Sequence, residues 1–337
     1  MNLLWMFLFA SCVTWGLTGL LRRYALARKL MDEPNIRGSH SIPTPRGGGV
    51  AIVASFLTGV VFLWGSSFLS DNSFVALMGA GLLIAIIGFV DDHGHIAARW
   101  RLLVHFIASG WLLFWLGGLP PLLLFGAEYD LAWLGHILAL IALVWLLNLY
   151  NFMDGIDGIA GVEALSATLV VGVIIKLVND HQGILLLLML MSASVTGFLA
   201  WNFPRAKIFM GDAGSGFLGL MLGSLAVYSI HIEQQMIWVW LILLGVFIVD
   251  ATYTLIRRIL RGDKLYEAHC SHAYQNASRK YGNHLVVTLS VMVINLFWLA
   301  PWSFAVIFDI VDGVMAVICA YAPLMWLARY FHAGEME

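Results

Sequence analysis

The chain has 337 residues, of which 61% are hydrophobic and only 11% are charged, and its formal net charge is −2. Since a soluble domain carries about 25% charged residues, this composition excludes an ordinary cytosolic enzyme, a disordered chain and a nucleic-acid binder, which needs a basic surface. The three cysteines show no paired spacing, so neither a disulfide framework nor a zinc site is expected. An integral membrane protein with many spans remains.

Apolar segments long enough to cross a bilayer recur along the chain, and each needs about 20 residues. Eleven are predicted, near residues 3–21, 48–69, 73–90, 102–118, 132–150, 159–178, 183–201, 215–230, 236–256, 285–308 and 311–330. The last two adjoin, so ten spans is the alternative count. Because no basic region precedes the first segment, it is predicted to be a span and not a signal peptide. The fold class is therefore all-α and polytopic, with residues 1–337 in a single transmembrane domain.

The lysines and arginines predict the orientation of these spans. All of them except Lys176 fall in alternate connections, near residues 22–47, 91–101, 151–158, 202–214 and 257–284, or at the C-terminal end. These connections are predicted to be cytoplasmic, which places the N-terminus outside and the C-terminus in the cytoplasm. This orientation favours an odd number of spans.

Five aspartates stand at the predicted cytoplasmic ends of the spans. Asp91 and Asp92 end the third span, Asp154 and Asp157 follow the fifth, and Asp212 precedes the eighth. Unpaired acids close to hydrocarbon are costly, and Mg²⁺ commonly bridges carboxylates to substrate phosphates. We therefore predict a divalent-cation site where these ends converge. For any single aspartate, pairing with a nearby lysine or arginine is the simpler alternative.

The first cytoplasmic loop, residues 32–49, is a candidate phosphate-binding segment. Its prolines keep it non-helical, and its glycine triplet 47–49 precedes a helix, where backbone amides and the helix dipole favour an anion. Arg46 adds a donor. The alternative is a basic loop that only fixes orientation or contacts anionic lipid.

The last cytoplasmic loop contains a second basic segment, residues 257–275. Arg257 and Arg258 are candidates to hold a diphosphate, and His269 and His272 are spaced to share one helix face. The alternative is a solvated face whose charges pair internally. Asp250 lies within the span that precedes this loop, so solvation does not readily account for it.

Five segments in this chain occur together in a known family. They are DEPNIRGSHSIPTPRGGG (32–49), the Asp91-Asp92 pair, NLYNFMDGIDGIAG (148–161), NFPRAKIFMGDAGS (202–215) and the basic loop that ends in HCSH (269–272). In this order and on one face, they resemble the polyprenyl-phosphate N-acetylhexosamine-1-phosphate transferases, relatives of the peptidoglycan translocase. The chain looks most like the members that initiate O-antigen synthesis. Ser271 departs from the His-x-His-His pattern of many members, which bears on the choice of sugar.

The resemblance implies a reaction at the cytoplasmic face of a bacterial inner membrane. Undecaprenyl phosphate attacks the β-phosphorus of a UDP-N-acetylhexosamine and releases UMP, which initiates O-antigen or lipopolysaccharide synthesis. The expected sugar is N-acetyl-fucosamine, N-acetyl-quinovosamine or N-acetylglucosamine. The resemblance also implies Mg²⁺, with Mn²⁺ as a substitute, and makes a homodimer plausible. The alternatives are transfer of the peptidoglycan type, from UDP-MurNAc-pentapeptide, and a transporter or flippase of lipid intermediates.

Residue roles follow from the same resemblance. Asp212 is the expected Mg²⁺ ligand, and Asp91 and Asp92 are expected at the lipid phosphate and the metal, with Asp91 the candidate base. The other expected substrate contacts are Asn151, Asp154 and Asp157 near the nucleotide, Phe209 stacked on uracil, and Arg46, Lys207, Arg257, Arg258, His269 and His272 on phosphate or sugar.

Overall fold

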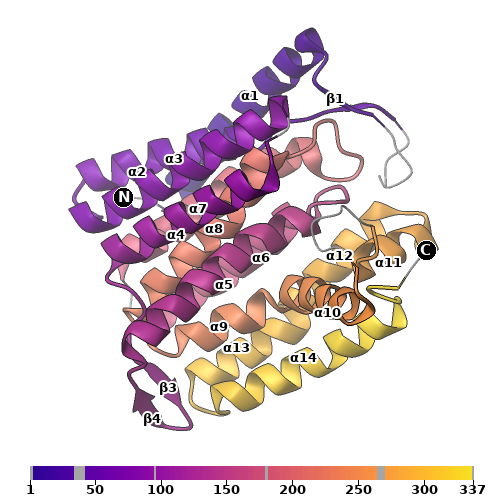
Figure 1. The fold of residues 1–337 in the computed structure, drawn as a ribbon. Helices are drawn as coiled ribbons and strands as arrows, with labels where there is room; N and C mark the ends of the chain where they lie inside the picture. The colour runs from indigo at the N-terminus through magenta and orange to yellow at the C-terminus, as the bar shows by residue number, and fades with distance from the viewer. Residues whose placement is uncertain (1–2, 34–41, 95, 179–180, 264–269, 336–337) are drawn as a thin grey trace.

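The computed structural model describes residues 3–33, 42–94, 96–178, 181–263 and 270–335, and most of them are helical (Figure 1). The helices are α1 (Leu3–Arg28), α2 (Val50–Gly65), α3 (Asp71–His93), α4 (Ala98–Leu116), α5 (Ala132–Met153), α6 (Ile159–Val178), α7 (Gln182–Asn202), α8 (Asp212–Ile230), α9 (Met236–Leu243), α10 (Gly245–Arg261), α11 (Ala273–Tyr281), α12 (His284–Ile294), the π-helical turn η1 (Asn295–Leu299), α13 (Ala300–Ile307) and α14 (Gly313–Tyr330). Two small antiparallel sheets pair β1 (Met31–Asp32) with β2 (Thr44–Pro45) and β3 (Leu122–Leu124) with β4 (Ala127–Tyr129).

The predicted all-α, polytopic architecture is confirmed. Among the described residues, eight helices are long and apolar enough to cross a membrane, and the bent pair α9–α10 raises the number to nine. Every predicted span is largely helical, but two of the eleven are not among these nine: α2 has only 16 residues, and α4 begins with two arginines in its first turn, Arg99 and Arg101. The last two predicted segments are separate helices, α12–α13 and α14.

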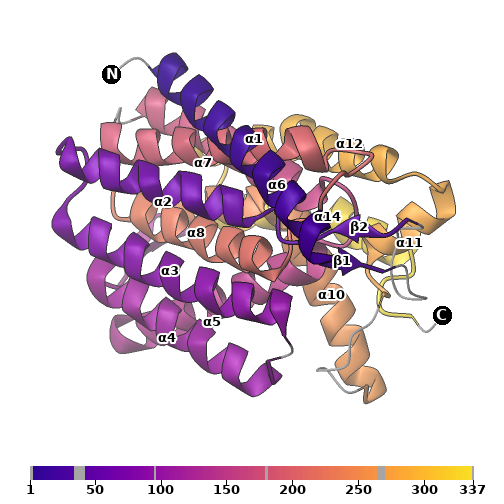
Figure 2. The same cartoon turned by 90° about the horizontal axis from the view of Figure 1, so that it is seen from above.

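The predicted span at 236–256 is broken. Its two halves meet at a bend of 68°, and α10 projects away from the bundle in Figure 2. At the break, a Cβ on Gly245 would lie 2.9 Å from an aromatic ring of α14. The buried Glu163 of α6 accepts a hydrogen bond at Oε2 from Asn295 Nδ2, at 2.6 Å.

Helix α8 forms the centre of the bundle, and its small residues allow close packing. A Cβ on Gly88 of α3 would lie 2.5 Å from the Ala213 Cα, and a Cβ on Gly219 would lie 2.8 Å from the Leu147 Cα of α5. Small residues at such crossings let helix backbones approach within a membrane. The end of α3, the start of α8 and the second half of α5 are thereby held close together.

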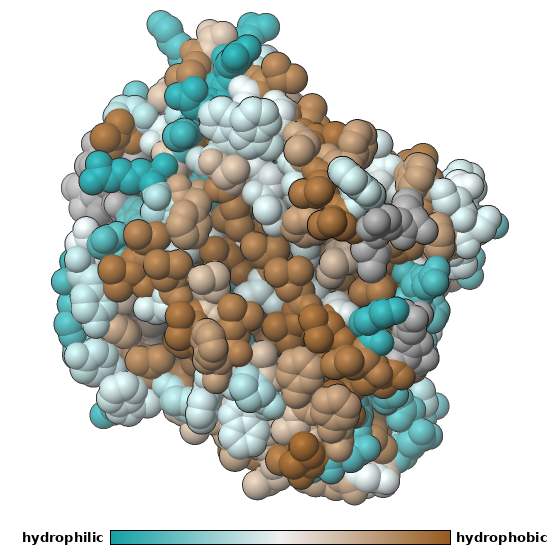
Figure 3. All heavy atoms as spheres, turned by 180° about the vertical axis from the view of Figure 1, so that it is seen from behind, coloured by the Kyte–Doolittle hydropathy of each residue, from teal (hydrophilic) through white to brown (hydrophobic). Residues whose placement is uncertain are grey.

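The two ends of the bundle carry different segments. The N-terminus and the β3–β4 sheet lie at one end, and the β1–β2 sheet and the C-terminus lie at the other (Figures 1 and 2). Termini at opposite ends agree with an odd number of crossings. Figure 3 shows apolar side chains over the middle of the rear face, with hydrophilic residues toward its rim, as expected for a protein surrounded by lipid.

Candidate active site

The ends of α3 and α8 bring two of the predicted aspartates to one arginine. Arg46 Nε lies 3.0 Å from Asp92 Oδ1, and Arg46 Nη2 lies 2.6 Å from Asp212 Oδ1. Arg46 follows β2 and reaches both acids, although 166 residues separate it from Asp212. The first predicted loop and the two acidic motifs therefore meet at one place.

A second arginine, which the sequence reasoning did not single out, completes this group. Arg101 Nη1 lies 2.5 Å from Asp91 Oδ2 and 3.4 Å from Asp212 Oδ2. We call Arg46, Asp91, Asp92, Arg101 and Asp212 the acid–arginine cluster. Its signal in the sequence was a basic residue in the first turn of the helix that follows the aspartate pair.

Within the cluster, Asp92 holds the beginning of α8. Its Oδ1 accepts from the Asp212 amide at 2.9 Å, and its Oδ2 accepts from the Ala213 amide at 3.2 Å. Gly211 makes this approach feasible, because its φ is +80° and a Cβ there would lie 2.7 Å from Asp92 Oδ2. Asp92 thus acts as a helix cap supplied from another helix. Asp91 and Asp212 are the more exposed acids of the cluster, at 9% and 18% of their side-chain surface against 4% for Asp92.

Asn151 joins the cluster at the end of α5. When its amide is oriented to suit its neighbours, the nitrogen donates to Asp212 Oδ1 at 3.2 Å and to Ser215 Oγ at 3.0 Å. The amide oxygen then accepts from Arg101 Nη2 at 2.9 Å. The structure therefore brings the start of the third predicted motif against the metal-ligand candidate Asp212.

Asp154 follows α5 and is only partly exposed. Burial raises the pKa of Asp154 well above its usual range, and the nearby carboxylate of Asp212 raises it further. A bound proton or an added cation would offset the negative charge of these neighbouring carboxylates. The loop is held from outside by Tyr274 of α11, whose hydroxyl donates to the Phe152 carbonyl at 2.9 Å. Because a Cβ on Gly155 would lie 2.1 Å from that hydroxyl, only glycine fits there.

The glycine triplet does not present its amides as predicted. The Gly48 amide donates to the Phe209 carbonyl at 2.9 Å, and the Gly49 amide donates to the Met210 carbonyl at 2.8 Å. The Phe209 amide in turn donates to the Pro45 carbonyl at 2.8 Å. These two amides are therefore not available to an anion. Their function is to join the first loop to the segment that precedes α8.

In the described residues of the basic segment, Arg257, Arg258 and Arg261 stand at the end of α10, and each pairs with an acid. Arg257 Nη1 lies 3.0 Å from Glu335 Oε1, and the buried Arg258 lies 3.4 Å from Asp263. Hydrogen bonds from Arg261 and Arg258 lower the pKa of Asp263. The roles of Arg257 and Arg258 at phosphate remain predictions.

The remaining candidates from this segment are placed as follows. Asp250 accepts from the amides of Ala273 and Tyr274 at 2.9 and 3.0 Å, and its Oδ1 lies 3.3 Å from His272 Nδ1. The intramembrane acid that the sequence left unexplained is thus the cap of α11. His272 is buried, and the predicted contact His269 lies outside the described residues.

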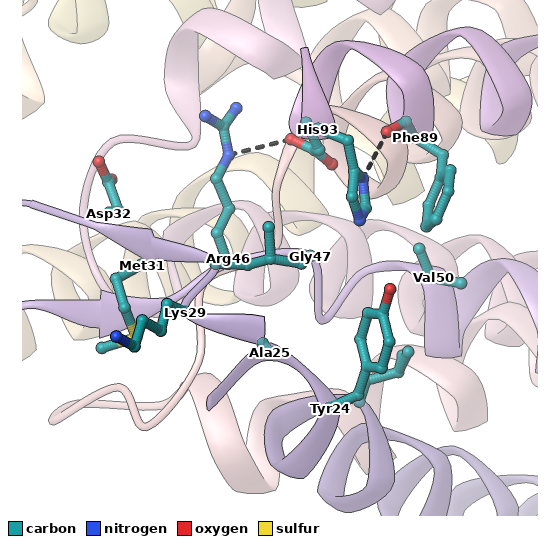
Figure 4. A pocket seen from close by; sticks show the side chains of 13 residues that line it. Tyr24, Ala25, Lys29, Met31, Asp32, Arg46, Gly47, Val50, Phe89 and His93 are labelled. Atoms are coloured by element: carbon teal, nitrogen blue, oxygen red, sulfur yellow. Dashed lines mark hydrogen bonds and ion pairs between the residues drawn. The ribbon is translucent and has the colours of Figure 1, made fainter. Parts of the chain in front are cut away.

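Two cavities border this region. One, of about 210 Å³, opens beside Arg46 and Asp92 and is otherwise lined by the ends of α1 and α3 and by β1 (Figure 4). The other, of about 550 Å³, is lined by Phe209 and Asp157 together with residues 204–206 and 282–285. Its lining includes two of the four residues expected near the nucleotide, and Asn151 and Asp154 are not among the residues that line it. Lys207 is exposed outside these cavities, with its Nζ 5.6 Å from the Trp201 ring centroid.

The donor set of the cluster suits a hard cation. Oxygens of Asp91 and Asp212 approach the same nitrogen of Arg101, and the Asn151 amide adjoins them. Carboxylate and amide oxygens are the ligands that Mg²⁺ prefers. In the part of the chain that the structure describes, however, no three His, Cys, Asp or Glu side chains are grouped as a metal site. Arginines hold the acids in the present arrangement.

Comparisons with known proteins agree with this geometry. Residues 74–230 match the family model described as glycosyl transferase family 4. The chain is 30% identical to a probable undecaprenyl-phosphate N-acetylglucosaminyl 1-phosphate transferase of Bacillus subtilis, over 83% of this chain and 77% of the relative. It is also 30% identical to a decaprenyl-phosphate N-acetylglucosaminephosphotransferase of Mycolicibacterium smegmatis, over 98% and 90%. A phospho-N-acetylmuramoyl-pentapeptide-transferase of Thermosynechococcus vestitus is 30% identical over 74% and 68%.

Proposed function

Because this chain belongs to glycosyl transferase family 4 and is a polyprenyl-phosphate hexosamine-1-phosphate transferase, we propose that it transfers an N-acetylhexosamine-1-phosphate from a UDP-sugar to undecaprenyl phosphate. The products are UMP and the lipid diphosphate sugar, which initiates O-antigen or lipopolysaccharide synthesis. The observation that carries the proposal is the acid–arginine cluster at one end of the spans. One substrate is a lipid and the other is soluble, so their phosphates meet at the membrane surface.

The reaction joins two polyanions, so neutralisation and positioning dominate catalysis. An oxygen of the lipid phosphate attacks the β-phosphorus, the bond from that phosphorus to the bridging oxygen breaks, and UMP leaves with the bridging oxygen. Arg46 and Arg101 carry the positive charge of the cluster, and Asp91 is the proposed base. The lipid phosphate's second pKa should lie near neutrality, as for other phosphate monoesters, so the base has little work to do.

Asp91, Asp212 and Asn151 are the proposed holders of Mg²⁺, with Mn²⁺ as a substitute. The metal, when bound, supplies positive charge to the phosphate oxygens. The raised pKa of Asp154 supports this assignment, since a further positive charge would relieve the crowding of acids around it. Phe209 and Asp157 line the cavity proposed for the nucleotide.

We further propose that the cluster lies at the cytoplasmic face of a bacterial inner membrane, because the lysines and arginines gather at this end. A homodimer is the proposed assembly. N-acetylglucosamine is favoured as the sugar because several relatives are named for the transfer of N-acetylglucosamine phosphate, and N-acetyl-fucosamine and N-acetyl-quinovosamine stay as proposals from the resemblance to O-antigen enzymes.

The test is a panel of UDP-sugars with undecaprenyl phosphate and purified protein, with UMP release measured at a series of Mg²⁺ concentrations. We expect release that needs both the lipid phosphate and the metal, and that EDTA abolishes. A flippase would release no UMP, and an enzyme of the peptidoglycan type would act only on UDP-MurNAc-pentapeptide. Either result would contradict the proposal.

A further inference from the structure

The cavity beside Phe209 has a wall that none of the family segments supplies. Residues 282–285 form it, at the junction of α11 and α12. Gly282 ends α11 in the left-handed conformation, with φ of +62°, and Asn283 caps α12 by accepting from the Leu285 amide at 2.9 Å. This tight turn brings His284, the first residue of α12, to the cavity.

His284 is in contact with Asp157, which lies 127 residues earlier in the chain. Its Nδ1 is 3.2 Å from Asp157 Oδ1 and 3.4 Å from the Asp157 amide nitrogen. One turn further along α12, Thr288 Oγ1 donates to the Asp157 carbonyl at 2.8 Å. His284 and Thr288, one helical turn apart on the same face of α12, therefore hold both the side chain and the backbone of Asp157.

Asp157 passes this restraint on to the opposite side of the cavity. Its second carboxylate oxygen, Oδ2, accepts from the Ala206 amide at 2.9 Å. Ala206 belongs to the segment that leads to Phe209, the residue proposed to stack on uracil. Only 11% of the Asp157 side chain is exposed. Its carboxylate thus links two walls of the cavity more than it offers a free surface to a ligand.

We propose that His284 is a positioning residue of the nucleotide cavity. By orienting Asp157, it keeps the 154–158 loop and the segment carrying Phe209 at the separation that admits the uridine part of the donor. This inference rests on the proposed function and extends it to a residue outside the family segments. Asn283 and Thr288 already secure the end of α12 and the loop backbone. His284 at Oδ1 and the Ala206 amide at Oδ2 together orient the Asp157 carboxylate, and His284 is the side chain among these contacts that a substitution can remove.

The test compares His284→Ala, His284→Asn and wild type in purified protein. For His284→Ala we expect the KM for the UDP-sugar to rise about tenfold, the factor that one lost hydrogen bond to a charged group gives, with the KM for undecaprenyl phosphate unchanged. An asparagine offers both a donor and an acceptor near the position of Nδ1, which lies against the Asp157 carboxylate and accepts from the Asp157 amide, so His284→Asn should recover most of the loss. His231→Ala is the matched control, because His231 is also a hydrogen-bonded histidine, 3.0 Å from the Gly118 carbonyl at the opposite end of α8.

Binding of UDP-N-acetylglucosamine, measured by thermal shift, provides a readout that does not depend on turnover. We expect UDP-N-acetylglucosamine to raise the melting temperature of His284→Ala less than that of wild type, and to raise those of His284→Asn and His231→Ala as much as that of wild type. Without ligand, all the variants should melt at similar temperatures. Equal rises in both KM values, or no recovery with asparagine, would overturn the inference. A wild type that binds the UDP-sugar but releases no UMP would contradict the proposed function alone, and the binding measurements would still decide the role of His284.

Discussion

Replacing Arg46 by alanine removes a guanidinium that contacts Asp92 and Asp212 at once. Removing one partner of a buried ion pair costs about 3–5 kcal/mol, whereas an exposed pair contributes about 0–1 kcal/mol. The Asp92 side chain is 4% exposed and that of Arg46 is 37% exposed, so this pair lies between the two cases. We expect a loss of about 2 kcal/mol in the free energy of unfolding, concentrated at the junction of α3 and α8.

The assay is the melting temperature of the detergent-solubilised protein, with and without Mg²⁺. Arg46→Ala should lower it by about 3 °C, and Mg²⁺ should restore more stability to the variant than to wild type, because the guanidinium no longer competes for the carboxylates. Arg329→Ala is the matched control, since Arg329 is an exposed arginine at the end of α14. An Arg46→Ala protein that melts like wild type at every Mg²⁺ concentration would refute the idea that Arg46 compensates these acids.

Three further results are expected. Asp212→Asn should lower UMP release at least about 100-fold, the scale of losing one electrostatic contact in the transition state, while the purified protein stays folded; near-normal release would remove Asp212 from the site. Gly211→Ala should destabilise the protein by about 1–3 kcal/mol, because its φ is positive and a Cβ would meet Asp92 Oδ2; an unchanged melting temperature would show that this turn relaxes. Tyr274→Phe deletes the hydrogen bond to the Phe152 carbonyl and should cost about 1 kcal/mol, with limited proteolysis of the 151–158 loop as the readout; an unchanged cleavage rate would contradict the bracing role of α11.

Local sequence patterns were sufficient to predict the architecture. A long apolar segment crosses a bilayer as a helix, because each of its backbone N–H and C=O groups needs a hydrogen-bond partner inside the protein. For that reason each predicted span is largely helical. The break between α9 and α10 was not predicted, because it depends on the packing of Gly245 against Tyr321 of α14. Nothing within 236–256 marks this distant contact.

The candidate site divides in the same way. The aspartates were found because acids at span ends are costly and therefore conspicuous, and the segments around them resemble a family. Their assignment to different tasks needed the tertiary structure. Asp92 differs from the adjacent Asp91 because the close approach of Gly88 to α8 directs it to two backbone amides.

The sequence by itself therefore determined that this is a multi-span membrane protein whose lysines and arginines gather at one end together with the five candidate aspartates, because hydrophobicity and charge are properties of each segment alone. The tertiary structure decided which charges meet. It placed Arg46 and Arg101 among the acids, joined the glycine triplet to the segment before α8, and set His284 against Asp157. These contacts join residues from separate segments of the chain, and only the packing of helices around α8 and the loops at their ends fixes such distances.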